Sequence, residues 1–325
     1  MSVRFFVRSG LLAGAVLAVA ATAFAQSDYP NRPIKIVVGF SPGGPSDIIG
    51  RIVGAKTGEL LGQQVVVENR TGAGGLIANE MVARSAPDGY TLLNTATSVA
   101  VNETLSKTIK VEFGKDLVAV ALQADTANIL VVHPSLGVKN FTEFLALVKS
   151  KPGEINYASA GRGTATHLSG EMFNMMAGTK MQAVHYRGGG DTLKDLVSGQ
   201  VKVMFSSIAP VAGLVREGKL LAFGTTGPKR DFSFPDLPTI AELGIAGYEM
   251  RLWVGMTAPT GTPREIIKKL ETANNAALRM PEVQKALAAQ GFAPLIGTAE
   301  EFDAFYRKER DKFAQLVKAA GLDKE

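Results

Sequence analysis

The sequence predicts an α/β protein with two lobes, each a mainly parallel sheet flanked by helices. Short β-branched runs alternate with helical stretches, and glycines recur between them, which is the pattern of strand, loop and helix units. Removing an N-terminal segment of 25 residues from the 325 leaves 300. That length exceeds what one hydrophobic core comfortably holds and suits two domains of ordinary size.

The N-terminal segment, residues 1–25, has the pattern of a secretory signal peptide. Arg4 and Arg8 precede an apolar run at residues 11–20, and an Ala-x-Ala site ends at Ala25. The apolar run is shorter than the about 20 residues that span a bilayer, and no later segment supplies such a run. We therefore expect cleavage near Ala25 and an exported, soluble mature protein that begins at Gln26.

The first part of the mature chain repeats a strand, a glycine loop and a helix. Residues 34–40 are apolar almost throughout, as in a strand covered on both faces, and a helix with one apolar side follows the loop at 41–46. A strand at 65–67 leads through the glycine-rich residues 70–75 into a helix at 77–83. The turn Pro87-Asp-Gly89 then precedes a strand at 90–94.

A polar stretch at residues 123–128 splits two apolar runs, and we expect the chain to cross there into the second lobe. The chain recrosses near 221–226, so the first lobe comprises 26–124 and 225–325 and the second lobe 125–224. Helices beginning at Pro263, Pro281 and Glu300 cover the first lobe. The remaining predicted elements are helices at 141–149, 166–176 and 191–197 and strands at 155–158, 181–186, 201–205 and 252–258.

Composition and motifs argue against several function classes. The net charge of +5 falls to +3 without Arg4 and Arg8, and the basic residues are dispersed, so nucleic acid is not an expected partner. The chain has no cysteine, and its three histidines lack the spacing of metal ligands. No Walker loop, Gly-x-Ser-x-Gly elbow or His-Glu-x-x-His motif occurs. We expect no metal, no cofactor, no catalysis and a monomer.

Three glycine-rich loops, at residues 41–47, 72–75 and 159–164, each join a strand to the start of a helix. A helix N-terminus presents unpaired N–H groups and about half a positive charge, so it holds an anion without a cationic side chain. Loops from different lobes facing each other across a cleft would grip a dicarboxylate at both ends. Each loop is also compatible with an ordinary turn between a strand and a helix. Asp47 either contacts a ligand or caps its own helix. The hydroxyl groups of Ser41, Ser159 and Thr164 either donate hydrogen bonds to a carboxylate or cap the helices that follow them.

Eight motifs in chain order resemble those of the tripartite tricarboxylate transporter substrate-binding proteins, also called the Bug family. The resemblance covers essentially the whole mature chain, although Gly39 and His185 stand where the family commonly has proline. The motifs are Tyr29-Pro-x-Arg-Pro-Ile34, Pro42-Gly-Gly-x-x-Asp47, Gly72-Ala-Gly-Gly75, Pro87-Asp-Gly-Tyr-Thr91, Ser159-x-Gly-x-Gly-Thr164 with His167-Leu168, Tyr186-Arg-Gly-Gly189, Pro235-Asp-Leu-Pro-Thr239 with Glu242-x-Gly244, and Ala258-Pro-x-Gly-Thr-Pro263.

The resemblance implies a periplasmic receptor with the type II Venus-flytrap fold of periplasmic binding proteins. Such a receptor closes on a small carboxylate (a mono-, di- or tricarboxylate, an amino acid or an aromatic acid) and delivers it to membrane transporter subunits. A sensory receptor for a membrane kinase and an exported hydrolase stay open as alternatives. The ligand-binding residues carried over from the family are Phe40, Ser41, Gly43, Gly44, Asp47, Ser159, Ala160, Gly163 and Thr164. We add Thr95, Ser98 and Ser206, which follow predicted strands.

Overall fold

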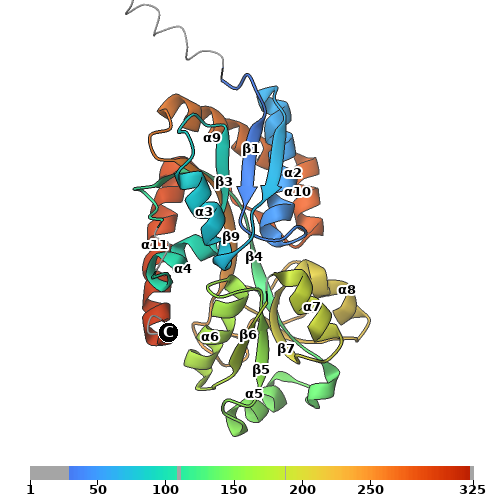
Figure 1. Cartoon of the computed structure of the whole chain (residues 1–325). Helices are drawn as coiled ribbons and strands as arrows, with labels where there is room; N and C mark the ends of the chain where they lie inside the picture. Colours follow the sequence, from blue (N-terminus) through green and yellow to red (C-terminus); the bar gives the residue numbers. More distant parts are fainter. Residues whose placement is uncertain (1–28, 108–110, 187, 323–325) are drawn as a thin grey trace, which may run out of the picture.

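The computed structural model describes residues 29–107, 111–186 and 188–322, and the predicted signal peptide lies outside them. Two lobes are stacked end to end and share one strand, β4 (Leu117–Val132). In Figure 1 the upper lobe contains both the blue N-terminal and the orange-red C-terminal segments, while the lower lobe is formed by the green and yellow middle of the chain. The fold is therefore the predicted two-lobed one.

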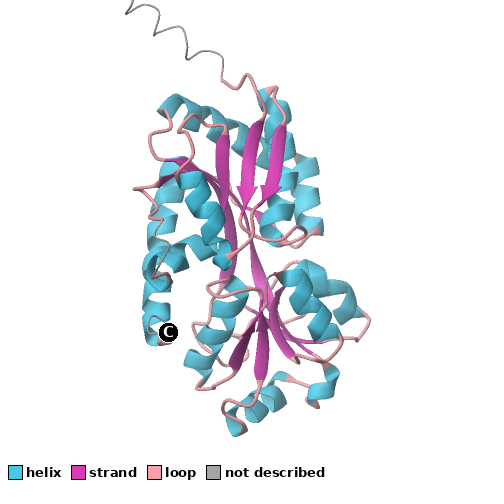
Figure 2. Cartoon of the chain, in the orientation of Figure 1, coloured by secondary structure: helices cyan, strands magenta, loops and turns pink. Residues whose placement is uncertain are grey.

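The first lobe is built on a sheet whose N-terminal strands are parallel. β1 (Ile34–Val38) lies between β2 (Val65–Asn69) and β3 (Thr91–Ala96), and β9 (Arg251–Pro259) continues the sheet antiparallel to β3. Helices cover both faces of this sheet (Figure 2). They are α2 (Pro45–Leu61), α3 (Leu76–Ala83), α4 (Thr97–Leu105), α9 (Arg264–Arg279), α10 (Pro281–Ala289) and α11 (Ala299–Ala319).

The second lobe repeats the arrangement on a smaller sheet. β5 (Asn156–Ser159) pairs in parallel with β6 (Gln182–His185) and with β7 (Val203–Ser207). The end of β4 pairs antiparallel with β7 and with β8 (Leu221–Thr225). The helices of this lobe are α5 (Phe141–Ser150), α6 (Ala165–Ala177), α7 (Gly189–Val197) and α8 (Ile208–Arg216).

The polar stretch 123–128 lies in the middle of β4, where the strand passes from one sheet to the other. The buried amide of Gln123 is hydrogen-bonded at both ends: Asn94 Nδ2 donates to Gln123 Oε1 (2.9 Å), and Gln123 Nε2 donates to Asn274 Oδ1 (3.2 Å). Because buried polar groups are tolerated when they are hydrogen-bonded, the strand continues through the crossing. The predicted change of lobe after residue 124 falls inside this strand, and the exact division of the chain between lobes stays a prediction.

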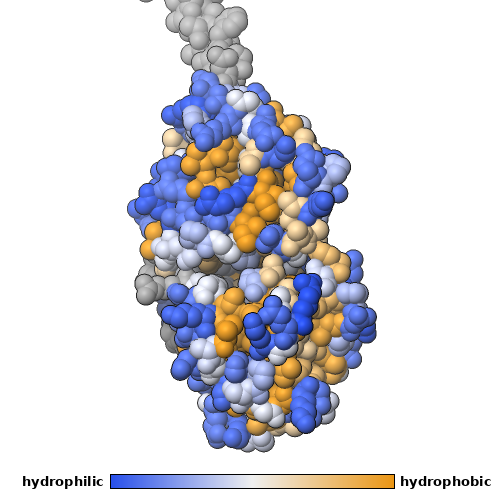
Figure 3. Space-filling model, turned by 90° about the vertical axis from the view of Figure 1, so that its right-hand side faces the viewer, coloured by the Kyte–Doolittle hydropathy of each residue, from blue (hydrophilic) through white to orange (hydrophobic). Residues whose placement is uncertain are grey.

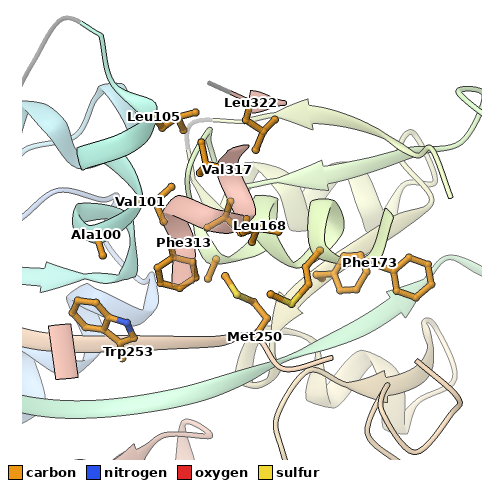
Figure 4. Packing of buried hydrophobic residues seen from close by; sticks show 14 of the residues in the cluster. Ala100, Val101, Leu105, Leu168, Phe173, Met250, Trp253, Phe313, Val317 and Leu322 are labelled. Atoms are coloured by element: carbon orange, nitrogen blue, oxygen red, sulfur yellow. The ribbon is translucent and has the colours of Figure 1, made fainter. Parts of the chain in front are cut away.

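The C-terminal helix α11 follows the first lobe and ends at the second. A capping box between Thr298 and Glu301 starts it, close to the predicted start at Glu300. Figure 4 shows Val317 and Leu322 beside α4 and beside Leu168 of α6, and these buried side chains belong to one hydrophobic cluster. Nη2 of Arg162 in the second lobe also donates to the carbonyl oxygen of Leu322 (2.9 Å). The segment 317–322 therefore contacts both lobes.

The outer surface is mixed in character. Polar residues cover much of both lobes in the view of Figure 3, with apolar areas between them. In the part of the chain that the structure describes, no helix is long and apolar enough to cross a membrane.

Candidate functional site

A cavity of about 330 Å³ lies between the lobes, at the ends of the parallel strands. The loops after β1 and β3 form its first-lobe wall, and the loops after β5, β6 and β7 form its second-lobe wall. Open α/β sheets bind ligands at this edge because the strand-to-helix loops converge there. Five helices, α2, α4, α6, α7 and α8, begin at the cavity wall.

The starts of these helices are left open towards the cavity. In the described residues no side chain caps α2, α4, α7 or α8, whereas Thr164 Oγ1 accepts from the His167 N–H (3.4 Å) at the start of α6. Each uncapped N-terminus exposes backbone N–H groups and about half a positive charge. Several such termini around one cavity favour an anion, and a carboxylate can replace the missing side-chain caps.

The cavity combines polar backbone with apolar side chains. None of the described residues that line it is charged. Ser41, Ser98 and Ser206 lie in its wall, together with the apolar residues Phe40 and Leu252. A small acid with an apolar body matches both surfaces, since the carboxylate meets hydrogen-bond donors and the carbon chain meets apolar walls.

The lobes touch each other around this cavity. A Cβ atom at Gly188 of the second lobe would lie 3.1 Å from Ser41 Oγ of the first. A Cβ atom at Gly74 of the first lobe would lie only 2.7 Å from the carbonyl oxygen of Arg162. Backbone comes this close only where glycine removes the side chain, so the glycines permit a closed cleft.

Comparison with known proteins shows to which family this chain belongs. The model of the tripartite tricarboxylate transporter family receptor matches residues 49–322. The chain belongs to this family. The receptor is therefore a binding protein of a family whose characterised structures are periplasmic solute-binding proteins and not enzymes.

Solved structures of relatives share its fold over almost their whole length. The periplasmic binding protein BugD superposes with a TM-score of 0.85 at 33% identity, covering 90% of the receptor and 99% of BugD. Rpa4515 of R. palustris, solved with adipate, gives 0.86 at 32% identity and the same two coverages. MatC from Rhodopseudomonas palustris, solved with bound malate, gives 0.83 at 31% identity, covering 89% of the receptor and all of MatC.

The structure brings most of the predicted site residues of the receptor to the cavity. Four do not line it: Asp47, Thr95, Ser159 and Gly163. Thr95 bonds to Thr257, and Ser159 Oγ donates to the Gly161 carbonyl oxygen (2.9 Å). The Gly163 N–H donates to His167 Nδ1 (3.1 Å). The predicted residues that line the cavity are Phe40, Ser41, Gly43, Gly44, Ser98, Ala160, Thr164 and Ser206.

Asp47 holds the first-lobe loop of the receptor in place from behind. Its carboxylate accepts from the Gly43 N–H (3.0 Å), from Arg51 Nε (3.0 Å) and from Asn69 Nδ2 (3.0 Å). The same Asn69 nitrogen donates to the carbonyl oxygen of Phe40 (2.9 Å). Burial raises the pKa of Asp47, but these hydrogen bonds and the Arg51 charge outweigh burial and hold the pKa below its ordinary value. Asp47 is thus ionised and fully engaged within its own lobe.

Several wall residues were not among the predicted ones, notably Thr97, Gly188, Gly189, Gly190 and Ser207. The glycine run at the start of α7 resembles the other glycine loops that we predicted to bind an anion. It could therefore have been used to predict this part of the cavity wall from the sequence. Thr97 and Ser207 stand at the starts of α4 and α8, two helices that we did not predict. The third glycine loop, 72–75, lines a neighbouring cavity instead. No cluster of three or more metal-binding side chains exists within the described residues.

Proposed function

We propose that this receptor captures a small carboxylate in the periplasm and delivers it to the membrane subunits of a tripartite tricarboxylate-type transporter. The observation that carries the proposal is the meeting of five helix N-termini at one uncharged cavity. Two relatives with the same fold were solved with carboxylates, adipate in Rpa4515 and malate in MatC, which supports a ligand of this class.

Capture follows from the division of the donors between the lobes. The first-lobe loop at residues 41–44 binds the acid in the open form, and closure adds the loops at 164–166 and 188–190. A buried carboxylate needs its hydrogen bonds supplied, and only the closed form supplies them from both sides. The acid therefore favours the closed form, which is the form that the transporter recognises.

A thermal-shift and calorimetry screen tests the capture step. The mature protein, unfolded and refolded to remove carried ligand, is titrated with malate, adipate, citrate and aromatic acids, and with the corresponding amides as matched uncharged controls. A ligand at about 100 times its Kd raises the free energy of unfolding by about 2.7 kcal/mol. We expect stabilisation by an acid and none by its amide. Equal responses to acid and amide, or none to any acid, would contradict carboxylate capture.

Delivery is tested separately. Proteoliposomes that contain the two membrane subunits of the transporter should accumulate the bound acid only when the loaded receptor is added. Uptake that is unchanged without the receptor would remove the delivery role while leaving capture intact.

A further inference from the structure

A second cavity, of about 620 Å³, adjoins the ligand cavity. Phe40 and Ala160 belong to the walls of both cavities. The glycine loop at 72–75 forms one side of the second cavity, and Lys107 and Arg162 lie in its wall. The two spaces are therefore neighbouring compartments of the same interlobe region.

The phenyl ring of Phe40 lies where the compartments meet. A Cβ atom at Gly75 would lie 3.4 Å from Cζ of Phe40 and 3.7 Å from Ser98 Oγ, so the ring tip and the Ser98 hydroxyl both lie against Gly75. Gly75 lines the second cavity and Ser98 lines the ligand cavity. The hydrogen bond from Asn69 to the Phe40 carbonyl oxygen fixes the backbone from which the ring projects.

The two compartments differ in charge. The described residues around the ligand cavity carry no charged side chain, whereas those around the second cavity include Lys107 and Arg162. Arg162 also donates to the Leu322 carbonyl oxygen, which holds its guanidinium at this wall. Two basic side chains in one wall attract a second anionic group at a distance from the first.

We propose that the ring of Phe40 is a partition that limits the length of the bound acid, and that the basic compartment behind it accepts the distal carboxylate of a longer α,ω-dicarboxylate when the ring is removed. This inference rests on the proposed carboxylate capture. Phe40 is then a specificity-determining residue for chain length, a role distinct from the backbone contacts of its loop.

Calorimetry with a homologous series of α,ω-dicarboxylates, from succinate to sebacate, tests the partition. Each buried methylene contributes about 0.8 kcal/mol, which corresponds to about a fourfold change in Kd. Wild-type affinity should fall once the chain exceeds the ligand cavity. Phe40→Ala should bind the long diacids at least about tenfold more tightly than wild type and move the optimum to a longer chain. Phe40→Leu should give an intermediate profile, and it serves as a second variant if Phe40→Ala does not fold.

The charge of the second compartment is tested in the Phe40→Ala background. Adding Lys107→Gln should reverse the gain for long diacids but not for monocarboxylic acids of equal length. Leu193→Ala is the matched control, since Leu193 lines only the ligand cavity and any gain from its removal should not depend on Lys107. If wild type binds short acids while Phe40→Ala and Phe40→Leu keep its length profile, the partition is wrong. If wild type binds no carboxylate at all, capture itself fails.

Discussion

Gly188 of the second lobe packs directly against Ser41 of the first, so that a Cβ atom at Gly188 would lie 3.1 Å from Ser41 Oγ and 3.4 Å from Ser41 Cβ. The backbone of Gly188 is extended, with φ 171° and ψ 177°, a conformation that other residues also adopt. Glycine at this position is therefore explained by the close contact across the cleft and not by the local backbone conformation. We therefore expect the proposed closure to be sensitive to a side chain at this position.

Gly188→Val should weaken carboxylate binding by about tenfold or more, because the added side chain opposes closure and lowers the fraction of the binding-competent form. The free energy of unfolding of the ligand-free protein should change little. Calorimetry and urea unfolding of the same samples separate the two effects. Gly213→Ala in α8 is the control, since no described atom lies within 4 Å of a Cβ there. Wild-type affinity in Gly188→Val would show that the closed contact does not matter for binding.

Asp47→Ala should lower the free energy of unfolding by about 1–3 kcal/mol, because Asn69 and the Gly43 N–H lose a buried acceptor. Ligand affinity should fall as well, since the loop that lines the cavity loses its support. Asp311→Ala is the matched control, because Asp311 lies on the surface of α11 and forms an exposed ion pair with Arg310, which contributes about 0–1 kcal/mol. Chemical denaturation and calorimetry provide the two measurements. Equal losses in the two variants would refute the supporting role of Asp47.

His167 should make stability depend on pH in mildly acidic solution. Burial, followed by the nearby His185 and Arg162, lowers the pKa of His167 from its ordinary 6.5 to about 3. In the unfolded chain the His167 imidazole is protonated below about pH 6.5, whereas in the folded protein it stays neutral down to about pH 3. The free energy of unfolding therefore falls as the pH drops through this window, by about 1.4 kcal/mol per pH unit from this group.

His167→Asn provides the comparison, since its side-chain oxygen can still accept from the Gly163 N–H. The difference in unfolding free energy between wild type and variant should shrink steadily between about pH 6 and pH 4. Parallel curves over this range would mean that His167 takes up its proton equally in both states.

The sequence predicts the repeated strand, glycine loop and helix units because their signals are local. Pro281 begins α10 as expected, since proline suits the first turn of a helix. The start of α4 is different: Thr97, Val99 and Val101 are β-branched, which disfavours a helix slightly, and we predicted no helix there, yet the segment is helical and buried. There tertiary packing overrides a weak propensity.

The binding site, too, could be predicted only as far as local sequence signals allow. The glycine loops indicate where an anion can approach the backbone. The direction of each side chain, however, depends on partners that are distant in the sequence. Asp47 faces Asn69, 22 residues away, and not the cavity. Gln123 reads as part of a polar crossing, yet it sits inside β4 because Asn94 and Asn274 satisfy its amide. Such long-range pairings have no signature in the local sequence.

Arg251→Ala should destabilise the crossing strands more than most surface changes. Arg251 of β9 pairs with the buried Asp125 of β4, and burial raises the pKa of Asp125 although Arg251 opposes that rise. Removing Arg251 leaves a buried carboxylate without its ion pair, and because the Arg251 side chain is itself 36% exposed we expect a loss of about 1–3 kcal/mol. Urea unfolding measures this loss. The double variant Asp125→Asn with Arg251→Ala should recover part of it, because no charge then stays buried. A double variant as unstable as the sum of the two single changes would show that the pair does not interact.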